Sequence, residues 1–117
     1  MIKIYGIRNC DTCRKALKWL EAEGIEHKFH DFRRDGLDAA ALDGWVRKVG
    51  WQKLLNRRGT TWRNLSEPEK DHLDGTKAEA LMIANPTLIK RPVFDCIGEI
   101  VVGFGTSDQH TLKALRL

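Results

Sequence analysis

Two cysteines three positions apart, Cys10 and Cys13, are the residues of this chain whose type and spacing most plainly suggest chemistry. A thiolate is both a nucleophile and a metal ligand, so such a pair can be a redox couple or one half of a zinc site. The pair can also be two small apolar side chains without a chemical role, because free cysteine packs as a small hydrophobe. The residues around the cysteines distinguish between these interpretations.

The residues that follow the pair predict a helix that begins near Asp11 and stops before Gly24. Its apolar residues recur at the spacing of one helix face: Cys13, Ala16, Leu17 and Leu20. Cys10 then lies at the helix N-terminus, where free N–H groups and the helix dipole lower a thiol pKa from about 8.5 to roughly 3.5–7.5. The pair therefore predicts an accessible nucleophile, Cys10, followed by a more buried resolving thiol, Cys13.

The remaining candidate ligands do not complete a zinc site. Structural zinc is usually bound by four ligands, and only Cys96 and four histidines remain. His27 and His30 are three apart on a predicted strand, so their side chains point to opposite faces. Cys96 lies in a predicted apolar strand and is interpreted as a core residue. No metal is therefore expected, and the redox interpretation of the cysteine pair is favoured.

Strands are predicted on both sides of the first helix. Residues 1–5 and 25–32 alternate apolar and polar side chains, which is the period of a strand. The resulting β-α-β unit predicts parallel strands joined by a right-handed crossover.

The middle of the chain predicts a helical segment. A helix is expected over 37–49 from its apolar stripe, and a second begins after the capping-box pattern of Ser66 and Glu69. Another is expected over 77–84, whereas 54–65 is expected to be a loop.

The last third of the chain predicts a hairpin and one more helix. Strands over 92–97 and 100–104 form a hairpin that turns around residues 98 and 99. Thr106 or Ser107 is expected to cap the last helix.

The order of these elements predicts the fold class. A β-α-β unit, a helical segment and a β-β-α unit around one sheet are the thioredoxin arrangement, and a C-x-x-C pair after the first strand narrows the choice to it. We therefore predict an α/β protein with a thioredoxin-like fold (β-α-β … β-β-α). Residues 1–117 are expected to form a single thioredoxin-like domain with a helical insertion over about 35–85.

Two arginines are candidates for binding an anion. Arg91 precedes Pro92 at the start of a strand, and in a thioredoxin arrangement this start faces the helix that carries the cysteines. Its planar guanidinium suits an oxyanion or the carboxylate of a small thiol. Arg58, in the stretch NRRGTTWR, is a second candidate. A solvated surface residue is the alternative interpretation of each.

The composition is that of an ordinary soluble protein. The 117 residues are 42% hydrophobic and 31% charged, and no apolar run approaches the ~18 residues that span a membrane, so no membrane partner is expected. The start of the chain carries no apolar signal region, which predicts a cytoplasmic protein.

A basic stretch over 47–63 contributes to the formal charge of +4. Because it lacks an RNA-binding aromatic signature, no direct contact with nucleic acid is expected.

The stretch KIYGIRNCDTCRKALKWLEAEGI, followed much later by LIKRPVF, closely resembles the arsenate reductase (ArsC)/Spx family. Within that family NRRGTTWR is most similar to the YffB-like proteins. The resemblance implies a thioredoxin-like fold with a helical insertion and a nucleophile at Cys10. It also implies substrate contacts at Arg14 and Arg91, and a cis residue at Pro92.

The resemblance implies one main function and two alternatives. For YffB-like proteins we expect a thiol-disulfide reductase that uses glutathione as co-substrate and has no tightly bound cofactor; Cys13 or glutathione resolves the intermediate. Spx proteins keep the C-x-x-C pair and regulate transcription by binding RNA polymerase, which makes the polymerase alpha subunit the alternative partner. Arsenate reductases of this type have serine at the position of Cys13 and arginine at that of Phe104. Loss of that oxyanion contact costs about 1.5–3 kcal/mol.

Overall fold

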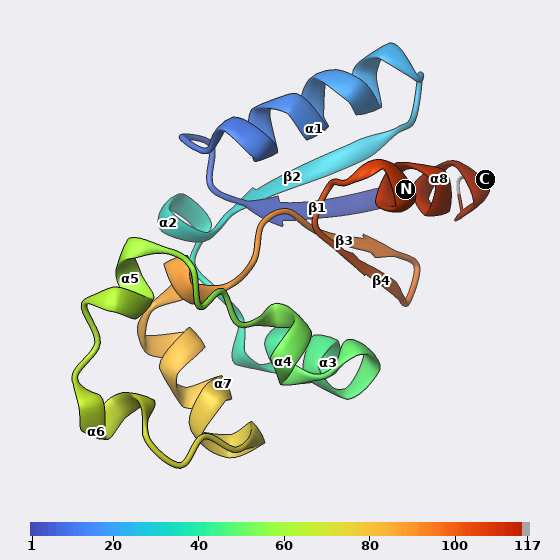
Figure 1. Cartoon of the computed structure of the whole chain (residues 1–117). Helices are drawn as coiled ribbons and strands as arrows, with labels where there is room; N and C mark the ends of the chain where they lie inside the picture. Colours follow the sequence, from blue (N-terminus) through green and yellow to red (C-terminus); the bar gives the residue numbers. More distant parts are fainter. Residues whose placement is uncertain (116–117) are drawn as a thin grey trace. The chain divides into compact units, whose positions relative to one another are not determined.

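The protein is built on a four-stranded sheet with the strand order β2-β1-β3-β4 (Figure 1). The computed structural model describes residues 1–115, and its strands are β1 (Ile2–Gly6), β2 (His27–Asp31), β3 (Val93–Cys96) and β4 (Glu99–Val102). β1 pairs with β2 in parallel, as the β-α-β pattern predicts. β3 pairs antiparallel with both β1 and β4. β1 is therefore a central strand that connects the two halves of the sheet.

Two helices cover one face of this sheet. α1 (Asp11–Ala22) joins β1 to β2, and α8 (Thr106–Leu115) follows β4. Their buried side chains and those of the sheet form one core cluster: Ile2, Ile4, Ala16, Leu20, Ile25, Phe94, Cys96, Val101 and Leu112. Full burial of a side chain such as Ile4, Leu20 or Phe94 contributes about 1.5–3 kcal/mol to the free energy of unfolding. The predicted α/β, thioredoxin-like fold is confirmed by this order of elements.

Asp31 ends β2 and holds the connection that leads into α1. Its Oδ2 accepts the Arg8 N–H at 3.0 Å, and its Oδ1 accepts the N–H groups of Arg33 at 2.8 Å and Arg34 at 3.3 Å, which caps α2 (Phe32–Asp35). Burial raises the pKa of this carboxyl, but the three N–H donors and the charge of Arg8 outweigh it and leave the pKa below its usual value. Asp31 therefore acts as a buried anion that ties the loop before Cys10 to the sheet.

A second compact unit, Leu37–Lys90, is helical. Its helices are α3 (Ala39–Val49), α4 (Trp51–Leu54), α5 (Thr60–Arg63), α6 (Glu67–Lys70), α7 (Gly75–Ala84) and the 3-10 helix η1 (Pro86–Leu88). The predicted capping box of Ser66 and Glu69 is present at the start of α6. A β-bridge joins Leu55 to Ile89, and both side chains are buried.

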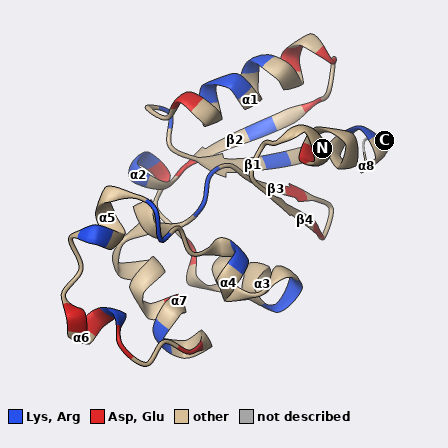
Figure 2. Ribbon diagram, in the orientation of Figure 1, with Lys and Arg blue, Asp and Glu red and all other residues tan. Residues whose placement is uncertain are grey.

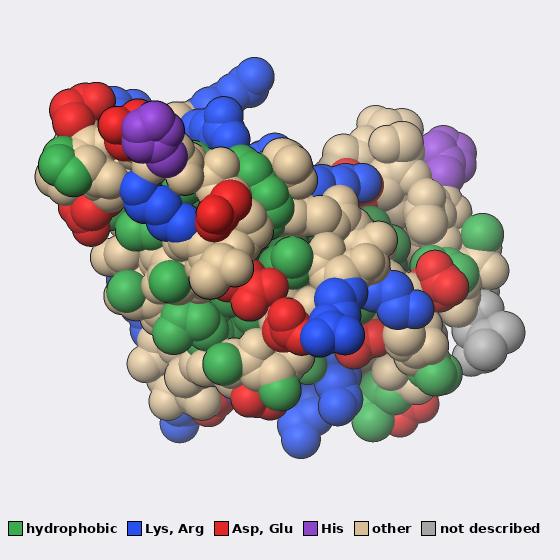
Figure 3. Space-filling view, turned by 90° about the horizontal axis from the view of Figure 1, so that it is seen from below, with side chains coloured by type: hydrophobic (Ala, Val, Ile, Leu, Met, Phe, Trp, Pro, Cys, Tyr) green, Lys and Arg blue, Asp and Glu red, His purple; other side chains and the backbone are tan. Residues whose placement is uncertain are grey.

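The remaining residues, Met1–Gly36 and Arg91–Leu117, make up the first unit. The predicted organisation as one domain of residues 1–117 with an insertion over about 35–85 stays a prediction, since compact units do not by themselves define a folding domain. None of the helices formed by residues 1–115 is long and apolar enough to cross a membrane. On the surface seen in Figure 3, basic, acidic and hydrophobic side chains are interspersed.

The expectation of a loop over 54–65 is wrong in part, because this stretch contains α5. One helical turn forms there although its sequence has no strong helix pattern. It is held by a hydrogen bond between the hydroxyls of Thr61 and Thr87 at 2.7 Å, and by the ammonium of Lys70 5.5 Å from the centre of the Trp62 ring. Tertiary contacts therefore stabilise a helix that local propensity does not predict.

Near the C-terminus, the hairpin turn and the start of the last helix each lie one residue away from the position that the sequence predicts. The hairpin turns at Ile97 and Gly98, since β4 already begins at Glu99. α8 begins at Thr106, so neither Thr106 nor Ser107 precedes the helix as a cap. Asp108 instead accepts the Gly105 N–H at 2.8 Å.

We predict that Asp31→Ala lowers the free energy of unfolding by about 2–4 kcal/mol, because it removes a helix cap and leaves the Arg8 N–H without its acceptor. Asp38→Ala is the matched control, since Asp38 caps α3 through one exposed hydrogen bond to the Ala40 N–H, and its loss costs about 1 kcal/mol. Urea unfolding at pH 7 measures both. Equal losses in the two variants would contradict the role assigned to Asp31.

Candidate active site

Cys10 lies directly before the first turn of α1. Its backbone is extended, with φ −139° and ψ 123°, and its carbonyl oxygen accepts the Arg14 N–H at 2.9 Å as the helix begins. The predicted helix N-terminus at Asp11 is thus confirmed. The side chain of Cys10 is half-buried, so its sulfur is accessible and also close to the backbone amides of the first turn.

The pKa of the Cys10 thiol is lowered from its usual value near 9. Partial burial is the largest single effect and raises the pKa, since it disfavours the charged thiolate. The backbone N–H of Cys13, the side chain and charge of Arg91, and the thiol of Cys13 act in the opposite direction and together prevail. Cys10 is therefore the thiol of this chain that is set up to ionise and react as a nucleophile.

Cys13 has the opposite environment. Its side chain is fully buried within α1's apolar stripe, and burial raises its pKa to about 12, with the negative charge of Cys10 acting in the same direction. Its sulfur also fills the space beside Gly6, where an added Cβ would lie 2.5 Å from Sγ. The predicted contrast between an accessible and a buried cysteine is present, whereas their roles as nucleophile and resolving thiol stay predictions.

The pairing of β1 with β3 places Arg91 and Pro92 next to the end of β1 that leads to Cys10. Tyr5 of β1 lies opposite Val93 of β3, so the residues before β3 are next to the end of β1. The bond between Arg91 and Pro92 is cis, as the family resemblance implies, and Pro92 is fully buried with its carbonyl oxygen accepting the Gly103 N–H at 2.8 Å. The guanidinium of Arg91, whose Nε is buried, interacts with the Cys10 sulfur.

Arg14 lies in the first turn of α1 and contacts two neighbouring polar residues. Its guanidinium forms an ion pair with Asp11 and a hydrogen bond with Oδ1 of Asn9 at 3.3 Å. About half of the Arg14 side chain is exposed, 51%, so the group remains accessible to a ligand. Its role as a substrate contact stays a prediction.

Arg58 belongs to the second unit, whereas Cys10 and Arg91 belong to the first. Its N–H donates to Oδ1 of Asn56 at 3.0 Å. It lines a hollow of about 490 Å³ with two other cations, Arg57 and Lys90. This unit therefore contains a basic hollow in which an anion would be stabilised, and the use of Arg58 in catalysis stays a prediction.

Sequence reasoning missed two residues that position this site. Gly6 is needed because the Cys13 sulfur leaves no room for a side chain, and a glycine that ends a strand just before the C-x-x-C pair is a signal of such a close approach. Asp31 is needed for the loop before Cys10, but nothing in its local sequence distinguishes it from other aspartates.

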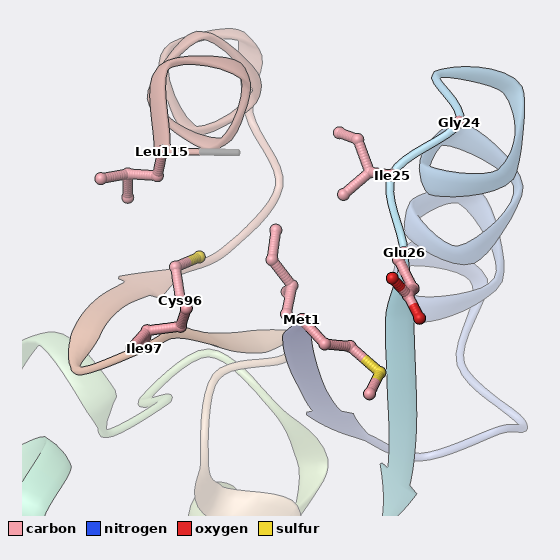
Figure 4. A pocket seen from close by; sticks show the side chains of 8 residues that line it. Met1, Gly24, Ile25, Glu26, Cys96, Ile97 and Leu115 are labelled. Atoms are coloured by element: carbon pink, nitrogen blue, oxygen red, sulfur yellow. The ribbon is translucent and has the colours of Figure 1, made fainter. Parts of the chain in front are cut away.

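Cys96 is separate from this pair. It is buried, as predicted, and burial, followed by the charges of Asp95 and Glu99, raises its pKa to about 11. It lines a cavity of about 360 Å³, shown in Figure 4. Within residues 1–115, no group of three or more histidine, cysteine, aspartate or glutamate side chains is arranged to hold a metal ion.

Comparison with known proteins places these residues in a family context. Residues 5–111 match the model of the ArsC family. An uncharacterised protein of Haemophilus influenzae is 51% identical over 114 residues, which is 97% of this chain and 100% of that protein. The solved structure of the YFFB (PA3664) protein covers 98% of this chain and 99% of its own, with 43% identity and a TM-score of 0.91. The global transcriptional regulator Spx of Listeria monocytogenes is 26% identical over 92% of this chain and 83% of its own length.

We predict that Arg91→Met raises the pKa of the Cys10 thiol, because it removes a hydrogen-bonding cation from beside the sulfur. The rate of Cys10 alkylation by iodoacetamide, followed peptide by peptide as a function of pH, measures this shift. Arg14→Met is the control, since Arg14 is paired with Asp11, and it should leave the profile nearly unchanged. Identical profiles for wild type and Arg91→Met would show that Arg91 does not stabilise the thiolate.

We also predict that Gly6→Ala destabilises the protein by about 1–3 kcal/mol, because its methyl group would overlap the buried Cys13 sulfur. Gly44→Ala in α3 is the control: nothing lies within 4 Å of its added Cβ, so it should stabilise by about 0.5–1 kcal/mol. Adding Cys13→Ala to Gly6→Ala should recover part of the loss in chemical denaturation. If the double variant is as unstable as the sum of the two single ones, the steric explanation fails.

Proposed function

The chain belongs to the ArsC family, and we propose that it is a cytoplasmic, glutathione-dependent thiol-disulfide oxidoreductase in which Cys10 is the nucleophile. The observation that carries the proposal is the environment of Cys10: a helix N-terminus and the Arg91 side chain act together to lower its pKa. The relatives of this chain include the global transcriptional regulator Spx, so a regulatory function is the alternative to an enzymatic one.

In the proposed first step, the Cys10 thiolate attacks one sulfur of a substrate disulfide. A new S–S bond forms between Cys10 and that sulfur, the substrate S–S bond breaks, and the other substrate sulfur leaves as a thiolate that takes a proton from water. Arg91 is beside the reacting sulfur and would hold an anionic group of the substrate there. Pro92 positions Arg91 as a buried anchor, and Arg14 and Arg58 are the further proposed substrate contacts.

In the second step, a thiolate attacks the mixed disulfide and breaks its S–S bond. Cys13 would attack the Cys10 sulfur, form a Cys10–Cys13 disulfide and release the bound group as a thiol. Glutathione would instead attack the sulfur of the bound group, form a new disulfide with it and release Cys10 as the thiolate.

Cys13 is poorly suited as the attacking thiolate, since its pKa of about 12 keeps it protonated. The negative charge of Cys10 contributes to the raised pKa of Cys13, and this charge is lost when Cys10 forms the mixed disulfide. Burial is the larger cause of the raised pKa, and it remains in the mixed disulfide. We therefore favour glutathione as the resolving thiol, with the two electrons for reduction supplied by glutathione oxidation.

A redox-sensing regulator is the second candidate, and the specific observation that favours it is the similarity to Spx over most of the chain. In that function, oxidation of the Cys10–Cys13 pair would change the binding of the protein to its partner, the RNA polymerase alpha subunit. A pull-down with the C-terminal domain of that subunit tests this function. Binding that changes when the pair is oxidised, in a protein that does not turn over glutathione, would favour the regulator.

Reduction of arsenate is a weaker candidate. Phe104 occupies the position at which arsenate reductases of this type have an oxyanion-binding arginine. Its ring lies 5.5 Å from that of Trp19 and 6.3 Å from that of Phe94, centre to centre. An apolar residue packed against the core offers no contact to an oxyanion. A direct assay with arsenate and glutathione tests the remaining activity.

We predict that Cys10→Ser abolishes reduction of a glutathione mixed disulfide, because a hydroxyl at this position does not ionise near neutral pH. Cys13→Ser should retain most of the activity if glutathione resolves the intermediate, and mass spectrometry should find a glutathionyl group on Cys10 when free glutathione is withheld. Turnover is followed by the oxidation of NADPH in a coupled glutathione reductase assay.

Cys96→Ser is the matched control, because this thiol is buried and its pKa is raised to about 11. Activity that survives in Cys10→Ser but is lost in Cys96→Ser would overturn the assignment of the nucleophile. Loss of turnover in Cys13→Ser equal to that in Cys10→Ser would make Cys13 the resolving thiol.

A further inference from the structure

The cavity beside Cys96 lies at the end of β1 opposite to the cysteine pair. β1 begins at Ile2, which lines the cavity, whereas Cys10 follows the other end of the strand. The walls also include Ile25 before β2, and Leu115 at the end of α8. Figure 4 shows the Cys96 sulfur directed into this space. Its volume of about 360 Å³ is within the range of roughly 300–1,000 Å³ that is typical of small-molecule sites.

Apolar side chains are exposed at the mouth of this cavity. Among residues 1–115, the exposed large hydrophobic side chains are Met1 at 63%, Ile83 at 38% and Ile97 at 75%, and both Met1 and Ile97 line the cavity. Scattered single exposures need no explanation, but adjacent ones around a hollow mark a binding surface.

Ile97 is also held in an unfavourable backbone conformation. Its φ is +54° and that of Gly98 is +92°, so both residues of this two-residue turn have a positive φ. Such turns strongly prefer Asn-Gly, and a positive φ in a β-branched residue is a true outlier. An isoleucine that is both strained and exposed contributes little to folding at this position, and strain of this kind is typical of functional sites.

Two acidic side chains of the described residues lie in or beside the cavity. Glu26 lines it, and Glu99 lies directly opposite Cys96 in the β3–β4 pairing, so the two side chains are on the same face of the sheet. Both carboxylates are exposed, and no ion pair involves either of them among residues 1–115. The α-amino group of Met1 opposes them as a single positive charge. Figure 2 shows acidic residues at both the α1–β2 connection and the β3–β4 hairpin.

We propose that this cavity is a binding site for a small apolar molecule that carries a cationic group. The apolar part occupies the space between Ile25, Cys96 and Leu115, and Met1 and Ile97 cover it, while the cation lies toward Glu26 and Glu99. The site requires neither Cys10 nor Arg91, so it extends beyond the proposed reductase activity and does not depend on it.

Two indole probes of opposite charge test the proposal: tryptamine, which carries an ammonium group, and indole-3-propionate, which carries a carboxylate. Each is titrated into the reduced, full-length protein and followed by the backbone amide signals in NMR spectra. Tryptamine should shift the signals of Ile25, Cys96 and Ile97 and bind about fivefold or more tightly than indole-3-propionate. Equal affinities for the two probes, or shifts confined to other residues, would overturn the proposal.

The variant Ile97→Asn separates binding from folding. Asparagine tolerates a positive φ, so the Asn-Gly turn should raise the melting temperature by about 3–6 °C, while loss of the apolar cover should weaken tryptamine binding about fivefold. A stabilised variant that binds tryptamine as well as the wild type would refute the role of Ile97.

The double variant Glu26→Gln with Glu99→Gln tests the charge preference. It should bring the affinities of the two probes close together, because the apolar walls are intact and the two carboxylates, which form the acidic rim of the cavity, have lost their charge. Glu67→Gln, an exposed acid of α6 in the other unit, is the control and should leave the preference for tryptamine unchanged. A preference that persists in the double variant would show that the acidic rim does not select the ligand.

Discussion

The antiparallel pairing of β1 with β3 is the constraint on which the rest of the candidate site depends. Because Tyr5 lies opposite Val93, the end of β1 that leads to Cys10 is next to the start of β3 that follows Arg91. A shift of this pairing by one residue would move every side chain of β3 to the other face of the sheet. The cation beside the sulfur is therefore supplied by sheet register, from a part of the chain far away in sequence.

The two thiols of the pair differ because one backbone transition separates them. At Cys10 the chain is still extended, so the sulfur faces the free N–H groups of the first turn and the guanidinium of Arg91. At Cys13 the chain is helical and the side chain points into the core, where a charge is poorly solvated. A spacing of three residues thus gives one thiol that ionises readily and one that resists ionisation.

The strands, α1 and the location of Cys10 could be predicted because each depends on local periodicity or on the start of a helix. Other features depend on contacts that no local pattern contains. α5 forms because Thr61 and Trp62 meet Thr87 and Lys70, and Asp31 acquires its role from the folded positions of its N–H donors. The hairpin turn differs by one residue because Ile97 adopts a conformation that isoleucine normally avoids, which no propensity rule would select.

The contact between Gly6 and Cys13 limits how the site can change over evolutionary time. The sulfur at position 13 and the missing side chain at position 6 fill one shared volume, so the two positions behave as a single steric unit. A side chain at position 6 therefore requires the sulfur at position 13 to move or to be replaced by a smaller group. Substitutions at these two positions should therefore be inherited as correlated pairs, which makes the strand end and the helix stripe co-evolving parts of one motif.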